Sequence, residues 1–274
     1  MRSVSFGQFY PSGSLIHRLD PRVKVLMTVA CIVATFLCKS LVAFIGLTLF
    51  SAFIILLSKI PFKLILRSIK GILFIIIFTS AINIFMTKGE QLLTPESWKI
   101  HIYAEGVWQA LFMILRITNL IIGTSILLTY TTTPIALTDA LESLLSPLKK
   151  LHLPVHDFAM MMTIALRFIP TLTEETEKIM CAQKARGADF SSGGLVKRAQ
   201  ALVPILVPLF VSAFNRAFDL ASAMECRCYH GGEGRTRLKV LQYRVVDWLS
   251  FAFVLGVCVG LFFLNRLGFG YVMR

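Results

Sequence analysis

The sequence predicts an all-α integral membrane protein with about five transmembrane helices and a block of about three further helices outside the hydrocarbon core. Of the 274 residues, 56% are hydrophobic, and the mean hydropathy is +0.73, values typical of a polytopic membrane protein. A transmembrane helix needs about 20 mostly apolar residues to cross ~30 Å of hydrocarbon. Five stretches are predicted to cross: Val23–Cys38, Leu41–Leu57, Leu66–Met86, Val107–Tyr130 and Val245–Leu264.

The first half of the chain carries clear signals for where these helices begin and end. Asp20 is a good N-cap and Pro21 suits the first helical position, so the first helix is predicted to start there. The first stretch passes into the second through only Lys39-Ser40, which indicates a tight hairpin. Lys59-Ile60-Pro61 ends the second stretch, and residues 87–106 form the one substantial loop on the far side.

Residues 131–244 are predicted to form a separate block, between residues 1–130 and the last span in 245–274. Its prolines and glycines divide it into three helices, which run to about Lys150, from about Pro154 to Ala188, and from about Leu195 to Met224. Within the third, Ala199–Phe214 is apolar enough for a span. Its two prolines, short length and flanking charges favour a helix at the interface or buried among others.

Lys and Arg placement predicts the orientation, with the N-terminus cytoplasmic and the C-terminus external. The N-terminal arm, the loop after the second span and residues 131–244 hold most of the 28 basic residues. Only Lys39, Lys88, Lys99, Arg266 and Arg274 fall on the other side. The net charge of +13 is therefore mainly charge of the cytoplasmic face, near anionic lipid. Nucleic acid is not an expected partner, because the basic residues are dispersed and no reader module is present.

Two arginines with small neighbours stand out in the central block: Ala185-Arg186-Gly187 and Cys226-Arg227-Cys228. One interpretation is helix capping, since a cation near a helix C-terminus interacts favourably with the helix dipole and Gly187 suits the position after the cap. The other is docking: small neighbours admit a partner's backbone, and a guanidinium offers a rigid fork of donors to a carboxylate.

Longer motifs around these arginines carry a resemblance to a known family. They are His17-Arg18-Leu19-Asp20-Pro21-Arg22, Leu166-Arg167-Phe168-Ile169-Pro170, Ala182-Gln183-Lys184-Ala185-Arg186-Gly187-Ala188-Asp189-Phe190, and Ala223-Met224-Glu225-Cys226-Arg227. The chain resembles, nearly end to end, the transmembrane T component of energy-coupling factor (ECF) transporters, the vitamin and transition-metal importers of prokaryotes.

The resemblance implies a multi-pass protein of the prokaryotic cell membrane with three partners: two ABC-type ATPase subunits and a separate substrate-binding membrane subunit, the S component. Each arginine motif would end a cytoplasmic coupling helix, and its arginine would dock in a groove on one ATPase. The second motif departs from the family pattern, because Cys226 and Cys228 replace the usual alanine and glycine. A cysteine cannot replace glycine at positive φ without cost.

Two further groups of residues are candidates with open alternatives. Met160, Met161 and Met162, with Pro204, Leu206 and Pro208, are either core packing or an adaptable surface for the S component. Arg116 and Asn119 fall near the middle of a span, where polar groups are costly. They are either functional or a structural pair facing the bundle interior.

No metal or cofactor is expected. Cys226, Cys228 and His230 spell C-x-C-x-H but lack a fourth ligand for structural zinc, and Pro154 separates His152 from His156. The chain has no Walker A pattern and no paired acids within its spans, so it is not predicted to be an enzyme. The expected function is that of a scaffold and coupling subunit. The alternative is a self-contained ABC-type permease or metal-ion channel subunit.

Overall fold

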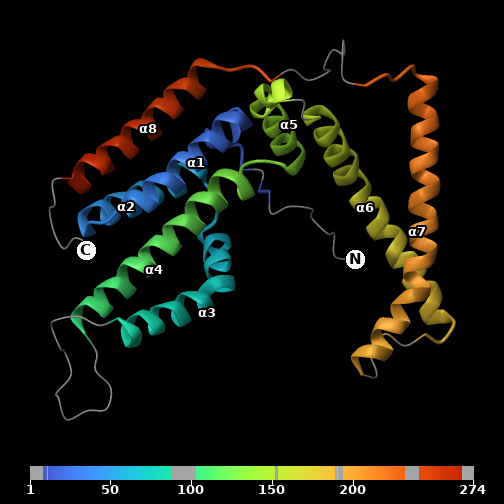
Figure 1. The fold of residues 1–274 in the computed structure, drawn as a ribbon, viewed down its shortest axis with the longest axis horizontal. Coiled ribbons are helices and arrows are strands. Elements are labelled where there is room, and N and C mark those ends of the chain that lie inside the picture. Colours follow the sequence, from blue (N-terminus) through green and yellow to red (C-terminus); the bar gives the residue numbers. More distant parts are fainter. Residues whose placement is uncertain are drawn as a thin grey trace. The chain divides into compact units, whose positions relative to one another are not determined.

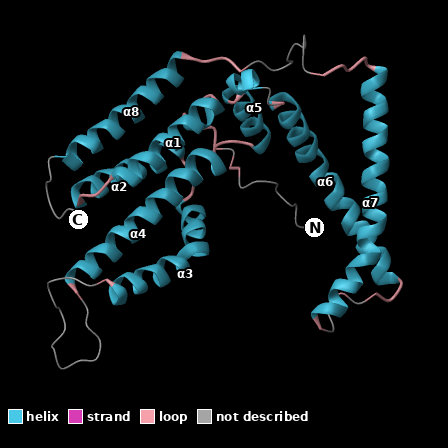
Figure 2. Ribbon diagram, in the orientation of Figure 1, coloured by secondary structure: helices cyan, strands magenta, loops and turns pink. Residues whose placement is uncertain are grey.

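A computed structural model describes residues 9–10, 12–87, 103–151, 154–188, 190, 194–231 and 241–266. This part of the chain contains helices and no strand (Figure 2). In chain order the elements are η1 (Ile16–Arg18), α1 (Pro21–Leu37), α2 (Leu41–Ser58), α3 (Phe62–Met86), α4 (Ala104–Thr124), η2 (Ser125–Tyr130), α5 (Pro134–Leu144), η3 (Ser146–Leu151), α6 (Val155–Ala185), α7 (Leu195–Cys226) and α8 (Val245–Arg266) (Figure 1).

The described residues divide into two compact units. The membrane unit lies within Gly7–Ala140 and Val240–Arg274, and the α6–α7 unit lies within Leu141–Lys239. In the membrane unit α1 packs against α8 and α4, and α2 packs against the same two helices, while α3 pairs with α4. The core is apolar, and its largest cluster includes Met27, Phe50 and Tyr130. Close packing of such side chains stabilises this unit through van der Waals contacts between its helices.

The start of α1 follows the predicted capping pattern. The Asp20 carboxylate accepts a hydrogen bond from the Arg22 backbone N–H at 2.9 Å, and Pro21 is the first helical residue. The second helix begins in the same way, because the Ser40 hydroxyl accepts from the Ala43 N–H at 3.2 Å. Only three residues separate Leu37 from Leu41, so the connection is as short as predicted, but the two helices pack mainly against α4 and α8 and not against each other as in a tight hairpin.

A buried carboxylate joins the starts of α1 and α8. The side chain of Asp247 is 1% exposed. Its Oδ2 accepts from the Arg244 N–H at 2.7 Å, and its Oδ1 accepts from the Asp20 N–H at 2.8 Å. One side chain therefore satisfies backbone donors at two helix N-termini, where a negative charge is also favoured by both helix dipoles.

A buried lysine, Lys24, donates hydrogen bonds to two backbone carbonyl groups near the start of α1. Lys24, also 1% exposed, donates from Nζ to the carbonyls of Thr131 (2.8 Å) and His17 (3.3 Å). The arm that precedes the first helix is therefore fixed to the end of η2 as well as to α8. At the other end of α8, Asn265 accepts from the Lys39 and Ser40 N–H groups and donates to the Leu37 carbonyl.

Among the described residues, five helices are long and apolar enough to cross a membrane. One of them is not among the five that were predicted to cross. Four agree: α2, α3, α4 continued by η2 (Ala104–Tyr130), and α8. The fifth is Ala199–Cys226 of α7 and not α1. Helix α1 has 17 residues, which span only ~25 Å at ~1.5 Å per residue.

Ala199–Phe214 was predicted to be too short to span a membrane, and this prediction is wrong. This stretch is part of α7, a single helix of 32 residues that contains both Pro204 and Pro208. A proline removes one backbone hydrogen bond from a helix, and the many remaining bonds of so long a helix keep it continuous. In the same way α6 is one helix of 31 residues with Pro170 inside it.

Candidate functional site: two arginine helix ends

Helices α6 and α7 form an antiparallel pair in the α6–α7 unit (Figure 1). An ion pair of 2.6 Å joins Arg216 Nη2 of α7 to Glu175 Oε2 of α6. Beyond the end of α7, the Tyr229 hydroxyl lies 3.1 Å from Met160 Sδ, near the start of α6. The end of α7 therefore lies near the start of α6, so the two helices run in opposite directions. Because Arg186 and Arg227 each follow the C-terminus of one of these helices, they lie at opposite ends of the pair.

The Glu175 carboxylate is held in its charged form. A hydrogen bond with Ser212, followed by the charge and hydrogen bond of Arg216, lowers the pKa of Glu175 below its usual value. The ion pair between α6 and α7 is therefore intact at neutral pH.

The first arginine motif, Ala185–Gly187, is a complete helix C-cap. Arg186 occupies the C-cap position of α6. The Gly187 N–H donates to the Lys184 carbonyl and the Ala188 N–H donates to the Gln183 carbonyl, each at 3.0 Å. Gly187 has φ +87°, the left-handed conformation of the residue after the cap. These bonds and this φ define a Schellman motif.

The second arginine motif, Cys226–Cys228, has the same backbone. Arg227 is the C-cap of α7. The Cys228 N–H donates to the Glu225 carbonyl at 2.9 Å, and the Tyr229 N–H donates to the Met224 carbonyl at 3.0 Å. Cys228 takes the position of Gly187 with φ +55°. For a residue with a Cβ this conformation costs about 1–2 kcal/mol.

Helix capping accounts for the backbone of the two motifs but requires neither guanidinium group. The carbonyls of the last turn receive the backbone donors of the Schellman bonds, and all six residues of the two motifs are exposed. Among the described residues, neither Arg186 nor Arg227 makes a side-chain hydrogen bond or an ion pair. Each helix thus ends in an exposed cation with five donors available to a partner.

A cleft lies beside the second motif. It has a volume of about 640 Å³ and is lined by Arg227, Cys228 and His230 together with side chains from the start of α6 and the end of α7, among them Met160 and Met224. The His230 Nδ1 lies 2.8 Å from the Cys228 carbonyl, which fixes this imidazole next to the motif.

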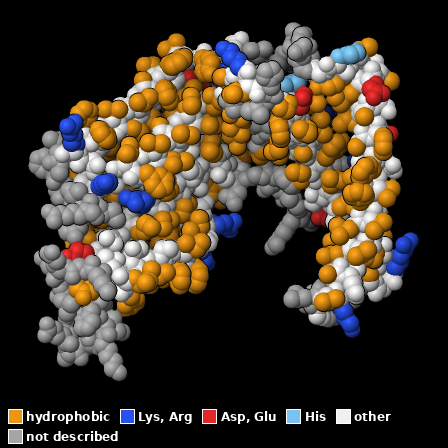
Figure 3. All heavy atoms as spheres, viewed as in Figure 1, with side chains coloured by type: hydrophobic (Ala, Val, Ile, Leu, Met, Phe, Trp, Pro, Cys, Tyr) orange, Lys and Arg blue, Asp and Glu red, His pale blue; other side chains and the backbone are white. Residues whose placement is uncertain are grey.

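The methionine and proline candidates lie toward opposite ends of the α6–α7 pair. Met160–Met162 precede Glu175 on α6, and Pro204–Pro208 precede Arg216 on α7. In an antiparallel pair these segments lie on opposite sides of the ion pair. Met161, Met162 and Leu206 are each more than half exposed, and Figure 3 shows hydrophobic side chains along α7. They form two apolar patches.

The polar residues of α4 join helices of the membrane unit. Asn119 is 4% exposed; its Oδ1 accepts from the Ser51 hydroxyl at 2.9 Å, and its Nδ2 donates to Thr48 Oγ1 at 3.0 Å. Arg116 Nη2 donates to the Cys38 carbonyl at 3.3 Å, and its guanidinium lies 5.7 Å from the centre of the Phe44 ring. Both contacts favour the structural interpretation of this pair.

The structure describes no group of three or more His, Cys, Asp or Glu side chains placed to hold a metal ion in the residues that it covers. His152 lies outside the described residues. His156 contacts a carboxylate instead, with its Nδ1 2.9 Å from Glu142 Oε1.

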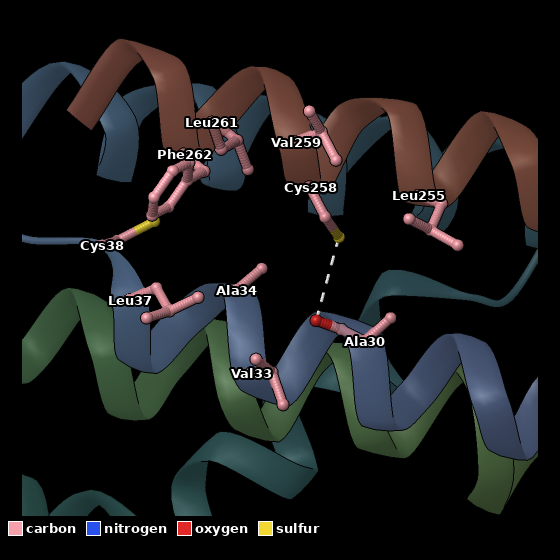
Figure 4. Close-up of a pocket in the computed structure, with 10 residues that line it drawn as sticks. All are labelled: Ala30, Val33, Ala34, Leu37, Cys38, Leu255, Cys258, Val259, Leu261 and Phe262. Carbon is pink, nitrogen blue, oxygen red and sulfur yellow. Dashed lines mark hydrogen bonds between the residues drawn. The ribbon is translucent and has the colours of Figure 1, made fainter. Parts of the chain in front are cut away.

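A separate apolar pocket of about 400 Å³ lies between α1 and α8 in the membrane unit (Figure 4). Cys258 faces the Ala30 carbonyl across it.

The sequence predicted that both arginine motifs lie at helix ends. It did not predict that the side chains of Asp247 and Lys24 connect separate elements of the membrane unit. The only available signal for Asp247 was its place in the first turn of α8, three residues after Arg244, where an acidic residue caps a helix. Its bond to Asp20 spans 227 residues and has no local signature.

The fold defines a multi-pass, all-α membrane protein in which two long helices end in exposed arginines. Residues 12–238 match the family model described as CbiQ, cobalt transport protein. The chain is 52% identical over 250 residues to the energy-coupling factor transporter transmembrane protein EcfT of Ruminiclostridium cellulolyticum, covering 91% of this chain and 92% of that protein.

Proteins with the same description are similar over almost their whole length in other bacteria. The identity is 49% with that of Clostridium kluyveri, covering 98% of this chain and 99% of the relative. It is 46% with that of Bacillus subtilis, covering 97% and 99%. The chain therefore belongs to the family of energy-coupling factor transporter transmembrane proteins. It is a transporter component and not a catalytic enzyme.

Proposed function

We propose that this chain is the scaffold and coupling subunit of an ECF importer. It passes the ATP-driven motion of two ATPase subunits to a substrate-binding membrane subunit that takes up a vitamin or a transition-metal ion. The observation that carries this proposal is the pair of matching helix ends, each presenting an exposed arginine that makes no side-chain bond among the described residues.

Each arginine is suited to bind a carboxylate in a groove of one ATPase. A guanidinium pairs with a carboxylate through two parallel charge-assisted hydrogen bonds. The small residues on either side of Arg186 and Arg227 allow the partner's backbone to come close. Since the backbone around the two arginines is the same, the two grooves that receive them are expected to be alike, as in a pair of related ATPases.

The distance between the two helix ends fits two separate binding sites. Helices α6 and α7 have 31 and 32 residues, so each is roughly 45 Å long at ~1.5 Å per residue. A long helix is stiff enough to move as a unit, and the Glu175–Arg216 ion pair connects the two helices between their ends. Closure of the ATPases would then change the angle at which the helices cross.

The exposed apolar patches provide a surface for the S component. Met161, Met162 and Leu206 expose about half or more of their area, and burying such a side chain against a partner contributes ~1.5–3 kcal/mol. Methionine side chains adapt to different surfaces, which suits a subunit that must move during the transport cycle. A change in the crossing angle of α6 and α7 would shift the two patches relative to each other.

This function requires that residues 131–244 lie on the cytoplasmic side or at its interface, between the membrane regions 1–130 and 245–274. Both arginines must reach ATPases on one side of the membrane. If α7 crossed the bilayer, its end at Arg227 would face the side opposite to its beginning. We therefore place α7 along the interface although it is long enough to span, and we count α1 as a span although it has only 17 residues. The five spans are then α1, α2, α3, α4 with η2, and α8, and this odd number puts the N-terminus of the chain in the cytoplasm and the C-terminus outside.

Charge reversal of the two arginines tests the proposal. The complex is purified through a tag on this chain from membranes that contain all subunits, and the ATPases and the S component are quantified. Arg186→Glu and Arg227→Glu should each reduce the bound ATPase by at least tenfold, because losing a buried charge pair costs ~2–5 kcal/mol. Uptake should fall with it.

Matched charge reversals at exposed residues of the same helices, Glu177→Lys on α6 and Lys197→Glu on α7, serve as controls. They should leave the complex intact, since both residues lie outside the arginine motifs. If both arginine reversals retain the ATPases and uptake, the coupling function is wrong. A purified chain that binds and transports substrate without other subunits would instead establish the alternative, a self-contained permease.

A second set of variants tests the S-component surface. Met161→Glu and Leu206→Glu should each release the S component while the ATPases stay bound, because a charge in an apolar contact is costly to bury. Loss of the ATPases with the S component retained would mean that the two surfaces have been assigned the wrong way round.

A further inference from the structure

Thiols distinguish the second arginine motif from the first. Cys226 and Cys228 stand where the first motif has Ala185 and Gly187. Both are free and exposed, and they lie on either side of Arg227. Cysteine at position 228 is not the residue that its backbone favours, because φ is +55° there. The thiol therefore occupies this position at a conformational cost that glycine would avoid.

We propose that Cys228, with Cys226 beside it, is a thiol-exchange site where a small peptide disulfide attaches and thereby releases Arg227 from its ATPase. The inference rests on the proposed docking of Arg227 and extends it, because it makes one of the two ATPase contacts sensitive to the redox state of small thiols. The other contact, at Arg186, lacks a thiol within its motif.

The surroundings of Cys228 can accommodate such a ligand. The thiol lines the cleft of about 640 Å³ together with Arg227 and His230, a size within the ~300–1,000 Å³ typical of small-molecule sites. The guanidinium in the wall of the cleft offers charge-assisted hydrogen bonds to a carboxylate. A small peptide disulfide with carboxylate groups therefore meets both a nucleophile and a matching charge at one place.

The exchange itself needs no reagent besides the disulfide. The Cys228 thiolate attacks one sulfur of the small disulfide, a new S–S bond forms, and the original S–S bond breaks. The second half leaves as a thiolate, which takes up the proton that Cys228 released. A reducing thiol reverses the reaction by the same path.

A disulfide between the two cysteines of the motif is the less favoured product. Residues two positions apart on a helix do not face each other, and Cys226 is the last residue of α7 while Cys228 is already in the left-handed conformation. Each thiol is thus directed to external reagents.

The adduct would oppose docking in two ways. It adds bulk next to Arg227, where small side chains are needed for close approach. Its carboxylates also compete with the ATPase carboxylate for the guanidinium. Only the contact at the end of α7 should be lost, since Ala185 and Gly187 cannot react.

The test uses the complete complex with Cys181→Ser in this chain, because Cys181 of α6 is also exposed. The complex is treated with glutathione disulfide, adducts are mapped by mass spectrometry, and bound ATPase is measured before and after treatment. We expect an adduct at Cys228 and a loss of at least tenfold in affinity for one ATPase. Dithiothreitol should restore binding.

Cys228→Ser and Cys226→Ser are the matched variants, each compared with its own untreated complex. Cys228→Ser should remove most of the response to glutathione disulfide, and Cys226→Ser should remove little of it. Thiols of the partner subunits are present in every complex, so a response that persists unchanged in Cys228→Ser would overturn the proposal. An absent adduct, or an adduct at Cys228 with both ATPases retained, would overturn it as well.

The failure of this inference is distinguishable from failure of the proposed function. If Arg227→Glu releases an ATPase and the Cys228 adduct does not, only the thiol site is wrong. If Arg227→Glu also leaves the ATPases bound, the docking of Arg227 itself is wrong.

Discussion

The ends of α6 and α7 have the same backbone and different side chains. Both finish in a Schellman motif with arginine at the C-cap, and the two hydrogen bonds that define the motif correspond residue by residue. Gly187 adopts its left-handed conformation freely, whereas Cys228 adopts it with a Cβ in place. The end of α7 also has a cleft beside its arginine.

The comparison shows that the backbone of the helix end positions the arginine, whereas the neighbouring side chains determine its surroundings. The direction in which each guanidinium leaves its helix follows from the C-cap geometry, which both sequences achieve. The neighbouring residues decide how closely a partner can approach and which chemistry is available there. We therefore expect the two ends to be equivalent in binding geometry and unequal in local stability and reactivity.

The largest expected effect concerns which side of the membrane the two ends face. Single cysteines at Ser192 and Gly232, which lie outside the described residues, are labelled from either side of sealed vesicles in a chain without its native cysteines. A membrane-impermeant maleimide should label both from the cytoplasmic side only. Labelling of the two sites from opposite sides would show that α7 crosses the bilayer, and the comparison of two ATPase contacts would fail.

Replacement of either arginine by lysine should weaken ATPase binding by about tenfold, or ~1.4 kcal/mol. Lysine keeps the charge but cannot form the two parallel hydrogen bonds of a guanidinium. Because the two caps share one geometry, Arg186→Lys and Arg227→Lys should have similar effects on the dissociation constants measured with purified subunits. A strong effect at one end and none at the other would show that the two grooves differ.

Exchange of the residues after the caps should change stability in opposite directions. Gly187→Cys should destabilise the end of α6 by about 1 kcal/mol, and Cys228→Gly should stabilise the end of α7 by a similar amount. Hydrogen exchange of the last-turn amides of each helix measures both changes. Equal stability in all variants would mean that the positive φ at Cys228 carries no cost.

The sequence predicted local features of the structure well, because they depend on neighbouring residues. The start of α1 at Asp20-Pro21 and the position of both arginines at helix ends follow from capping chemistry. The sequence also predicted α7 as one helix from about Leu195 to Met224 with Pro204 and Pro208 inside it, and the structure agrees, because a long helix tolerates the loss of single hydrogen bonds. The short length assigned to its apolar stretch was wrong, since that stretch continues to Cys226.

Long-range features could not be predicted from one sequence. The bond from Asp20 to Asp247 and the bond from Lys24 to Thr131 depend on which helix ends meet. The separation of Met160–Met162 from Pro204–Pro208 depends on the antiparallel pairing of α6 with α7, and the ion pair and the tyrosine–methionine contact reveal that pairing.

The smallest expected effect concerns the ion pair between the two ends. Hydrogen bonds from Ser212 and Arg216 lower the pKa of Glu175 below its usual value near 4.5. The unfolded chain therefore binds this proton more readily than the folded one, and the carboxylate contributes its full stabilisation above about pH 4.5. The contribution is lost as the pH falls through the lowered pKa.

Between pH 7 and 5 the pairing of α6 and α7 should thus be insensitive to acid at this site, and below that range it should loosen slightly. Glu175→Gln cannot be charged and should abolish this acid-dependent step, which hydrogen exchange in the middle of both helices would detect. Because the ion pair lies between the two arginines, its loss should affect the ends of α6 and α7 alike. A change confined to one end would show that the two helices do not move as one coupled pair.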